Sequence, residues 1–182
     1  MRKFLSSLLE VLEIAVVAVV AVYIVRTFLV QPFLVSGTSM YPNFSNGDYV
    51  LVDELTYRFR APERGEVVVF HDPEDLSVYF IKRIIGLPGE KISISNNTIT
   101  VYNKQNPQGF ALDESYLPAG TDTSGDKTVT LSSNTYLMLG DNRPFSYDSR
   151  SWGPLPAKDI VGLVRVRLWP VNDITAFAAP KY

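Results

Sequence analysis

Short apolar runs alternate with turn-forming residues along most of the chain after residue 42. The runs are rich in β-branched and aromatic side chains, and Gly, Pro, Asn and Asp stand between them. This pattern predicts strands rather than helices. The predicted strands are residues 49–52, 66–70, 78–81 with 84–85, 92–94, 98–102, 128–131, 136–139 and 160–169. Asn96 and Asn97 are expected to form a two-residue hairpin turn.

Residues 103–127 are polar and rich in Gly, Pro, Asp and Thr, yet they keep apolar side chains that can pack. We therefore predict a smaller β and loop subdomain there. The predicted fold is mainly β, with an N-terminal transmembrane helix, a larger β-rich domain and this subdomain. The predicted division is residues 1–32 for a cytoplasmic stub and membrane anchor, 33–90 and 128–170 for the core, 91–127 for the inserted subdomain and 171–182 for a tail.

The N-terminus differs from the rest because it is strongly apolar. Arg2 and Lys3 precede it, Glu10 and Glu13 interrupt its first half, and residues 14–25 carry no charge. A spanning helix needs about 20 apolar residues, which residues 4–25 supply only if the two glutamates are included.

Three interpretations of residues 4–25 compete: a membrane anchor, a cleaved signal peptide and a buried soluble helix. No small-residue cleavage pattern follows the segment, which speaks against a signal peptide. Its second half is apolar on every face, which speaks against an amphipathic soluble helix. We favour a retained single-pass anchor with the β-rich body on the extracytoplasmic side, because the basic residues at the start favour a cytoplasmic N-terminus.

The charge and composition exclude several classes of function. Lys and Arg total 17 against 19 Asp and Glu, without a basic tract, so nucleic-acid binding is not expected. The chain has no cysteine, which rules out disulfides, zinc–thiolate sites and a thiol nucleophile. His71 is its only histidine.

Residues 36–42, Ser-Gly-Thr-Ser-Met-Tyr-Pro, contain a candidate nucleophile, Ser39. Gly37 permits a tight turn beside the serine, and Pro42 fixes the backbone soon after it. A rigid turn of this kind can present a hydroxyl, although a Ser/Thr/Gly cluster before a proline is also typical of an ordinary loop.

Two side chains could act as the base for Ser39. A Ser-His-Asp arrangement would have to use His71, which stands before Asp72-Pro73 and is typical of a turn residue. The other candidate is Lys82, which lies within an apolar run, next to Arg83.

Successive strand residues point to opposite faces, so one of Lys82 and Arg83 is expected to point inward. Burial lowers the pKa of a lysine, and a shift from about 10.4 to about 7 corresponds to roughly 4–5 kcal/mol of desolvation. The alternative for Lys82 is a solvated strand lysine whose stem lies along the sheet.

A third cluster is residues 140–150, Gly-Asp-Asn-Arg-Pro-Phe-Ser-Tyr-Asp-Ser-Arg. Its turn formers predict a loop, and its acidic and arginine residues could form internal ion pairs. The loop follows an apolar strand directly, a position where rigid scaffolds often hold functional residues.

Together these clusters resemble the motif set of bacterial type I signal peptidases. The matching segments are residues 37–42, 79–90 and 140–150, with residues 64–70 as a fourth block. The four stand in the family's order behind an apolar N-terminus, and the resemblance extends to about Pro170. It implies a membrane serine endopeptidase that removes signal peptides from exported preproteins without a metal or cofactor. It also implies that the β-rich domain is the catalytic domain and is built from coiled, barrel-like sheets.

The resemblance also implies the roles of individual residues. Ser39 would be the nucleophile, with its backbone N–H in the oxyanion hole, and Lys82 the general base. The Ser146 hydroxyl would help to orient the lysine amine. The supporting ion pairs would be Asp141 with Arg83 and Asp148 with Arg150.

This sequence departs from the family pattern at two positions. Some relatives have a serine two residues before the nucleophile as a second oxyanion donor, but here that residue is Gly37 and Ser36 is one residue too early. Asn43 replaces the usual threonine after the proline, from which we expect a local effect on the turn and no loss of activity.

The family's substrates carry small residues at the first and third positions before the cut. This implies shallow pockets near residues 33–35 and the strand before Lys82, with the substrate extended along a sheet edge. The expected partners are signal peptides and membrane lipid. Two other interpretations stay open: a self-cleaving Ser–Lys protease of the repressor type, and a non-catalytic, membrane-tethered β domain that binds a protein partner.

Overall fold

The computed structural model describes residues 10–20 and 30–180. Residues 10–20 are helical, and their apolar side chains, such as Ile14 and Val17, are exposed. Within the described residues, no helix combines the length and the apolar character needed to cross a membrane. The predicted anchor over residues 4–25 lies only in part within the described residues, because 4–9 and 21–25 are outside them.

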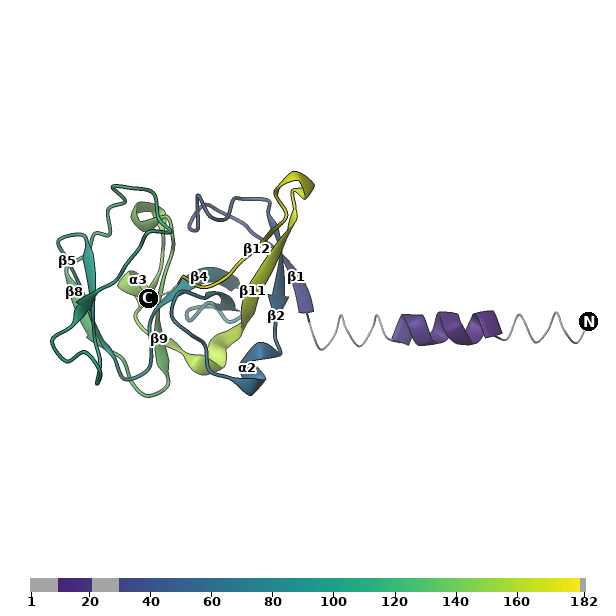
Figure 1. Ribbon diagram of the computed structural model, residues 1–182, viewed down its shortest axis with the longest axis horizontal. Helices are drawn as coiled ribbons and strands as arrows, with labels where there is room; N and C mark the ends of the chain where they lie inside the picture. The colour runs from purple at the N-terminus through teal and green to yellow at the C-terminus, as the bar shows by residue number, and fades with distance from the viewer. Residues whose placement is uncertain (1–9, 21–29, 181–182) are drawn as a thin grey trace, which may run out of the picture.

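The rest of the described chain is built from two antiparallel sheets (Figure 1). The main sheet has eight strands in the order β1-β2-β11-β3-β4-β9-β10, with β12 added beside β11, and the smaller sheet has the order β7-β6-β5-β8. The main-sheet strands are β1 (Val30–Leu34), β2 (Tyr49–Asp53), β3 (Val67–His71), β4 (Tyr79–Gly86), β9 (Thr135–Leu139), β10 (Leu155–Pro156), β11 (Ile160–Trp169) and β12 (Thr175–Ala176). The smaller-sheet strands are β5 (Lys91–Ser95), β6 (Thr98–Tyr102), β7 (Phe110–Ala111) and β8 (Lys127–Thr130).

The mainly β prediction is confirmed, and the long predicted strands lie where they were expected. Asn96 and Asn97 have φ angles of 49° and 59°, as a two-residue turn between β5 and β6 requires. Helices in the β body are short: α2 (Thr56–Phe59), α3 (Ser149–Trp152) and the 3₁₀ turns η1 (Arg143–Phe145), η2 (Ala157–Asp159) and η3 (Val171–Asp173).

Both faces of β4 are covered, which decides the environment of its charged residues. Ile84 packs into one buried cluster with Phe70 and Met138, whereas Ile85 packs into another with residues of the smaller sheet. Successive side chains of a strand point to opposite faces, so those in the second half of β4 enter the two buried clusters in turn. The expectation that only one of Lys82 and Arg83 points inward is wrong, because both are buried.

The loop after β1 is packed onto the main sheet by its own apolar residues. Met40 and Phe44 lie in a buried cluster with Val50, Val52 and other strand residues. The two loop side chains are almost completely buried. Their burial fixes the segment that carries Ser39.

Three predicted boundaries are displaced in the structure. Residues 30–32, assigned to the anchor, belong to β1, which pairs with β2. β8 pairs with β5 and so belongs to the smaller sheet rather than to the core. The tail contributes β12, which pairs with β11. In each case strand pairing across the fold, which local composition does not encode, sets the boundary.

We predict that Gly162→Ala destabilises the main sheet. A Cβ at residue 162 would lie 2.6 Å from the backbone oxygen of Asp53, and β2 and β11 are paired there. Overpacking of this kind costs about 1–3 kcal/mol, measurable as a lower melting temperature in detergent. Leu168→Ala is the control, because Leu168 lies on the same strand but is 40% exposed; an equal loss in both variants would contradict the prediction.

Candidate active site

Ser39 and Lys82 meet between the loop after β1 and the strand β4. Lys82 Nζ donates a hydrogen bond to Ser39 Oγ at 2.8 Å and a second to the Ile81 carbonyl at 3.0 Å. Strand β4 and a loop 43 residues earlier in the chain thus place an amine next to a hydroxyl.

The surroundings of Lys82 favour its neutral form. The residue is only 3% exposed. Desolvation by this burial lowers the pKa of Lys82 from 10.5 to about 8, against the opposing charges of Asp148, Asp141 and Asp72. With this pKa roughly one Lys82 amine in ten is neutral at pH 7 and can accept a proton, whereas an ordinary surface lysine is almost fully protonated there.

The loop from residue 140 holds the Ser39 turn from the other side. The Asn142 backbone N–H donates to the Ser39 carbonyl at 3.0 Å, and the Asn142 side chain donates to the Thr38 carbonyl at 3.0 Å. Gly140 lies so close that a Cβ there would overlap the Ser39 carbonyl and Ser146 Oγ. Only a glycine permits this approach.

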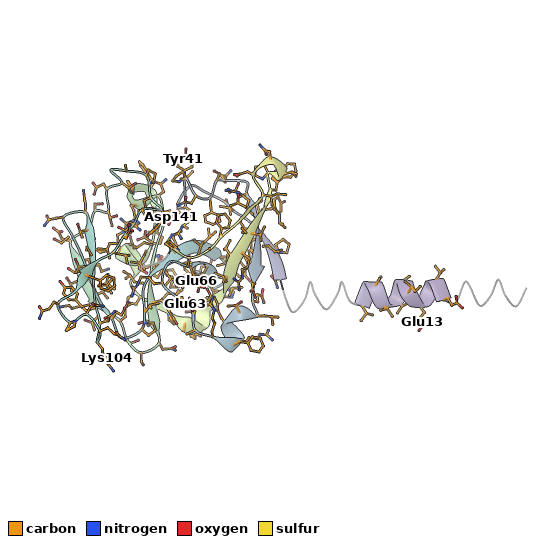
Figure 2. All side chains as sticks on the ribbon, in the orientation of Figure 1. Glu13, Tyr41, Glu63, Glu66, Lys104 and Asp141 are labelled. Atoms are coloured by element: carbon orange, nitrogen blue, oxygen red, sulfur yellow. The ribbon has the colours of Figure 1, made fainter. Side chains whose placement is uncertain are left out.

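Arg83 and Asp141 form the first expected ion pair. Arg83 Nε and Nη2 donate to the two carboxylate oxygens of Asp141 at 2.8 and 2.6 Å, and both side chains are buried. Asp141 lies in the interior of the β body (Figure 2). Because Arg83 follows Lys82 directly, the pair fixes β4 relative to the loop at residue 140.

Asn43 takes part in the same network, so the expectation of a merely local turn effect is wrong. Its side-chain amide donates to Asp141 Oδ2 at 2.8 Å and to the Tyr116 carbonyl at 3.1 Å. The Asn43 carbonyl in turn accepts a hydrogen bond from Arg167. The sequence signal for this role was the departure from threonine itself, since an amide reaches farther than a hydroxyl and offers two donors.

Asp148 and Arg150 form the second expected ion pair. Arg150 Nε and Nη2 donate to the two oxygens of Asp148 at 2.9 and 2.8 Å. Asp148 Oδ2 also accepts from the Gly140 backbone N–H at 3.1 Å. The pair therefore closes the loop from residue 140 to residue 150 on itself.

Arg143 is a buried site-loop residue that sequence reasoning missed. It donates to the Gly140 carbonyl, to Thr123 Oγ1, to the Glu114 carboxylate and to the Tyr116 hydroxyl. It thereby joins the site loop to the segment between β7 and β8. A long-range partner such as Glu114 has no signature in the local sequence.

Two other candidates are placed differently from expectation. Ser146 Oγ is buried and has no hydrogen-bond partner among the described residues, so its expected contact with Lys82 is not formed. Lys82 directs its hydrogen bonds to Ser39 and Ile81 instead. His71 Nδ1 donates to the Leu76 carbonyl at 2.7 Å in the turn after β3 and does not pair with Ser39.

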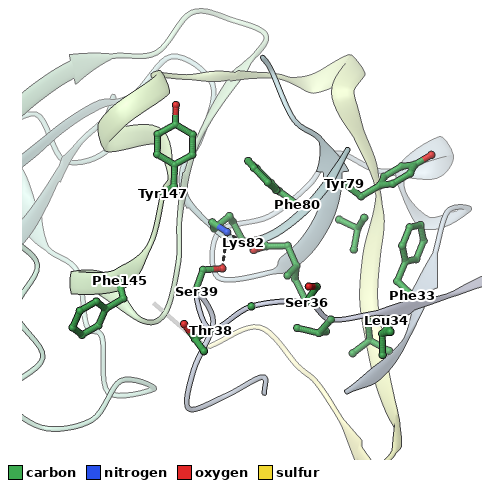
Figure 3. Close-up of a pocket in the computed structure, with 15 residues that line it drawn as sticks. Phe33, Leu34, Ser36, Thr38, Ser39, Tyr79, Phe80, Lys82, Phe145 and Tyr147 are labelled. Atoms are coloured by element: carbon green, nitrogen blue, oxygen red, sulfur yellow. Dashed lines mark hydrogen bonds between the residues drawn. The ribbon is translucent and has the colours of Figure 1, made fainter. Parts of the chain in front are cut away.

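A cleft of about 300 Å³ opens over the Ser39 hydroxyl and Lys82 (Figure 3). Residues of β1 and the following loop line one part of it, and the first half of β4 lines another. Fifteen residues line the cleft: Phe33, Leu34, Val35, Ser36, Gly37, Thr38, Ser39, Val50, Val69, Tyr79, Phe80, Ile81, Lys82, Phe145 and Tyr147.

Comparison with known families identifies the chain. The sequence model of the family described as "Signal peptidase, peptidase S26" matches residues 8–169. The chain belongs to the signal peptidase family. It is a serine peptidase, and the interpretations as a repressor-type protease or a non-catalytic β domain lose their support.

Several relatives of this signal peptidase match over most of their length. Signal peptidase I of Leptolyngbya laminosa is 35% identical over 164 residues, which cover 86% of this chain and 77% of that protein. The probable signal peptidase I-2 of Synechocystis sp. is 38% identical over 155 residues, covering 82% and 68%. Signal peptidase IB of Staphylococcus aureus (strain Mu50) is 34% identical over 179 residues, covering 92% and 93%. A crystal structure of a signal peptidase I from Enterococcus faecalis V583 aligns with a TM-score of 0.48 and 28% identity over 57% of this chain and 97% of that one.

We predict that Asp141→Asn strongly destabilises this signal peptidase. The change leaves the buried charge of Arg83 without its carboxylate, and breaking a buried pair in this way costs roughly 3–5 kcal/mol. Denaturant unfolding in detergent would measure the loss. Asp173→Asn is the matched control, because the Asp173 side chain is 54% exposed where it meets Arg167, and its loss should be about 1 kcal/mol or less. Comparable losses in the two variants would refute a structural role for the buried pair.

Proposed function

We propose that this chain removes N-terminal signal peptides from exported preproteins as a membrane-anchored serine endopeptidase. The apolar segment before β1 would contain the single-pass anchor, and the β body would act on the extracytoplasmic side. Family membership supports the reaction, and the apolar run over residues 14–25 supports the anchor. The two-sheet architecture supports a division into a catalytic core and an inserted smaller unit.

The hydrogen bond between Lys82 Nζ and Ser39 Oγ supports the chemical assignment most directly. At 2.8 Å the two atoms are within reach of proton transfer. Burial has already shifted the amine toward its neutral form. We therefore assign Ser39 as the nucleophile and Lys82 as the general base.

The reaction follows from these two groups. Neutral Lys82 Nζ takes the proton of Ser39 as Oγ attacks the scissile carbonyl carbon, and a tetrahedral intermediate forms. The Lys82 ammonium then gives this proton to the leaving nitrogen, which becomes the N-terminus of the mature protein. The signal peptide stays bound to Ser39 as an ester. Lys82 next takes a proton from water as the water oxygen attacks the ester carbonyl carbon. The Lys82 ammonium then returns this proton to Ser39 Oγ as the C–O bond breaks, which releases the signal peptide with a free carboxyl group.

The oxyanion of the tetrahedral intermediate needs hydrogen-bond donors. The Ser39 backbone N–H donates to no other described residue and adjoins the nucleophile, so it suits this role. The Gly37 N–H already donates to Asn46 Oδ1 at 2.9 Å. A second donor would therefore come from another main-chain group or from water.

The strand edges beside the cleft suit an extended substrate. Residues 79–82 of β4 pair with β3 on one side only, since β9 pairs with β4 from Arg83 onward. Among the residues that the structure describes, β1 likewise pairs only with β2. A substrate strand between these free edges could form main-chain hydrogen bonds, with the residues before the cut along Phe33 to Val35 and Tyr79 to Ile81.

We predict that Ser39→Ala and Lys82→Met each abolish cleavage of a signal-peptide reporter. Removing the nucleophile or its base should lower kcat by roughly 10⁴-fold or more. At pH 7 the Lys82→Met protein should also melt at a higher temperature than the wild type, because burying the protonated amine is costly. Matched controls are Ser45→Ala in the same loop and Lys91→Ala at an exposed position of β5, and both variants should stay active. Substantial activity in Ser39→Ala or Lys82→Met would remove that residue from the mechanism.

We predict that activity rises with pH through the pKa of Lys82. The amine must lose its proton before it can accept that of Ser39, so kcat/KM should rise with a midpoint near the Lys82 pKa of about 8 and level off at higher pH. The Asp72 carboxylate raises the pKa of Lys82, so Asp72→Asn should move the midpoint to lower pH. Asp75→Asn in the same turn is the control, with no expected shift. A midpoint that Asp72→Asn leaves in place would argue against Lys82 as the titrating group.

A further inference from the structure

Two aromatic side chains in the cleft have no part in the chemistry described above. Phe145 and Tyr147 lie on one side of the Ser39–Lys82 pair, whereas Phe33, Leu34 and Tyr79 lie on the other (Figure 3). Phe145 is 76% exposed and Tyr147 is 48% exposed. Large exposed rings beside a reactive pair are available to a bound chain.

The backbone of the loop holds both rings toward the cleft. Ser146, between them, is extended, with φ −117° and ψ 124°. Its side chain packs inward against Gly140, and the neighbouring Phe145 and Tyr147 side chains project from the loop in two different directions (Figure 3). The Asp148–Arg150 ion pair and the hydrogen bond from Arg150 Nη2 to the Arg143 carbonyl fix both ends of this short segment. The loop thus holds two separate aromatic rings at the edge of the cleft.

The carboxylate of Glu74 adjoins the Tyr147 ring. The Tyr147 hydroxyl donates to Glu74 Oε2 at 2.7 Å and so links the site loop to the turn between β3 and β4. Asp72 and Asp75 stand in the same turn. This side of the cleft therefore combines aromatic faces with negative charge.

The direction of the substrate follows from the proposed function. The signal peptide precedes the cut and would lie in the membrane, and β1 follows directly on the proposed anchor. The residues before the cut would then occupy the side of β1 and Tyr79. The residues after the cut would leave past Phe145 and Tyr147.

We propose that Phe145, Tyr147 and Glu74 form a subsite for the first residues of the mature protein. The inference rests on the proposed function. The rings can stack on an aromatic side chain, or hold the cation of a lysine or arginine over their faces with Glu74 as its counter-charge. An acidic side chain is repelled by the negative charge of Glu74. The subsite therefore selects aromatic and basic residues over acidic ones just after the cut.

The test uses the full-length enzyme in detergent and reporters that differ only in the second residue after the cut: Phe, Lys, Ala or Glu. For the wild type, kcat/KM should be roughly two- to tenfold higher with Phe or Lys than with Ala, and lowest with Glu. Phe145→Ala/Tyr147→Ala should bring the Phe-to-Ala ratio to about one. Glu74→Gln should raise the Glu reporter toward Ala and keep the Phe preference.

A second reporter series varies the third residue before the cut, and the double variant should keep the wild-type preference there. Phe59→Ala is the control protein, because Phe59 is 84% exposed on α2 and does not line the cleft. Cleavage at the expected bond with equal kcat/KM for all four residues would overturn the subsite and leave the proposed function intact. An unchanged Phe-to-Ala ratio in the double variant would also overturn it. Absence of all cleavage by the wild type would overturn the proposed function and the subsite with it.

Discussion

A lysine amine that is kept away from water, within hydrogen-bond reach of a serine hydroxyl, is the constraint on which the site depends. Desolvation lowers the pKa of Lys82, while nearby carboxylates act in the opposite direction. The balance is possible because Asp141 and Asp148 are each bound by an arginine. Each carboxylate interacts mainly with its own arginine, which weakens its effect on Lys82. Burial therefore still lowers the pKa of Lys82.

Buried arginines also hold three segments that are distant in sequence in fixed positions relative to one another. Arg83 and Asn43 both bind Asp141, so strand β4 and the loop of Ser39 meet at one carboxylate. Arg143 extends the connection to the segment between β7 and β8. A 2.8 Å hydrogen bond between Ser39 and Lys82 requires this rigidity. A displacement of about 1 Å of either the Ser39 loop or strand β4 would break it.

The strands were predictable because their signal is local. Turn residues such as Asn96 and Asn97 mark the hairpins, and alternation marks β2, β5 and β6, which have one open face. The pairings of β1, β8 and β12 were not predictable, because they depend on partners far away in the chain. The expectation of one inward side chain at Lys82 and Arg83 failed for a related reason, since the smaller sheet covers the second face of β4.

By itself, the sequence determined the chemistry available to this protein. It has one histidine, no cysteine and four motif blocks in the order of the signal peptidases, and these point to Ser39, Lys82 and the two ion pairs. Only the tertiary structure decided how these groups meet: that Asn43 reaches Asp141, that Ser146 Oγ does not bind Lys82, and that Phe145 and Tyr147 face the cleft. The physical reason is that residue types fix which interactions are possible, whereas strand pairing and burial fix distances and desolvation across the chain.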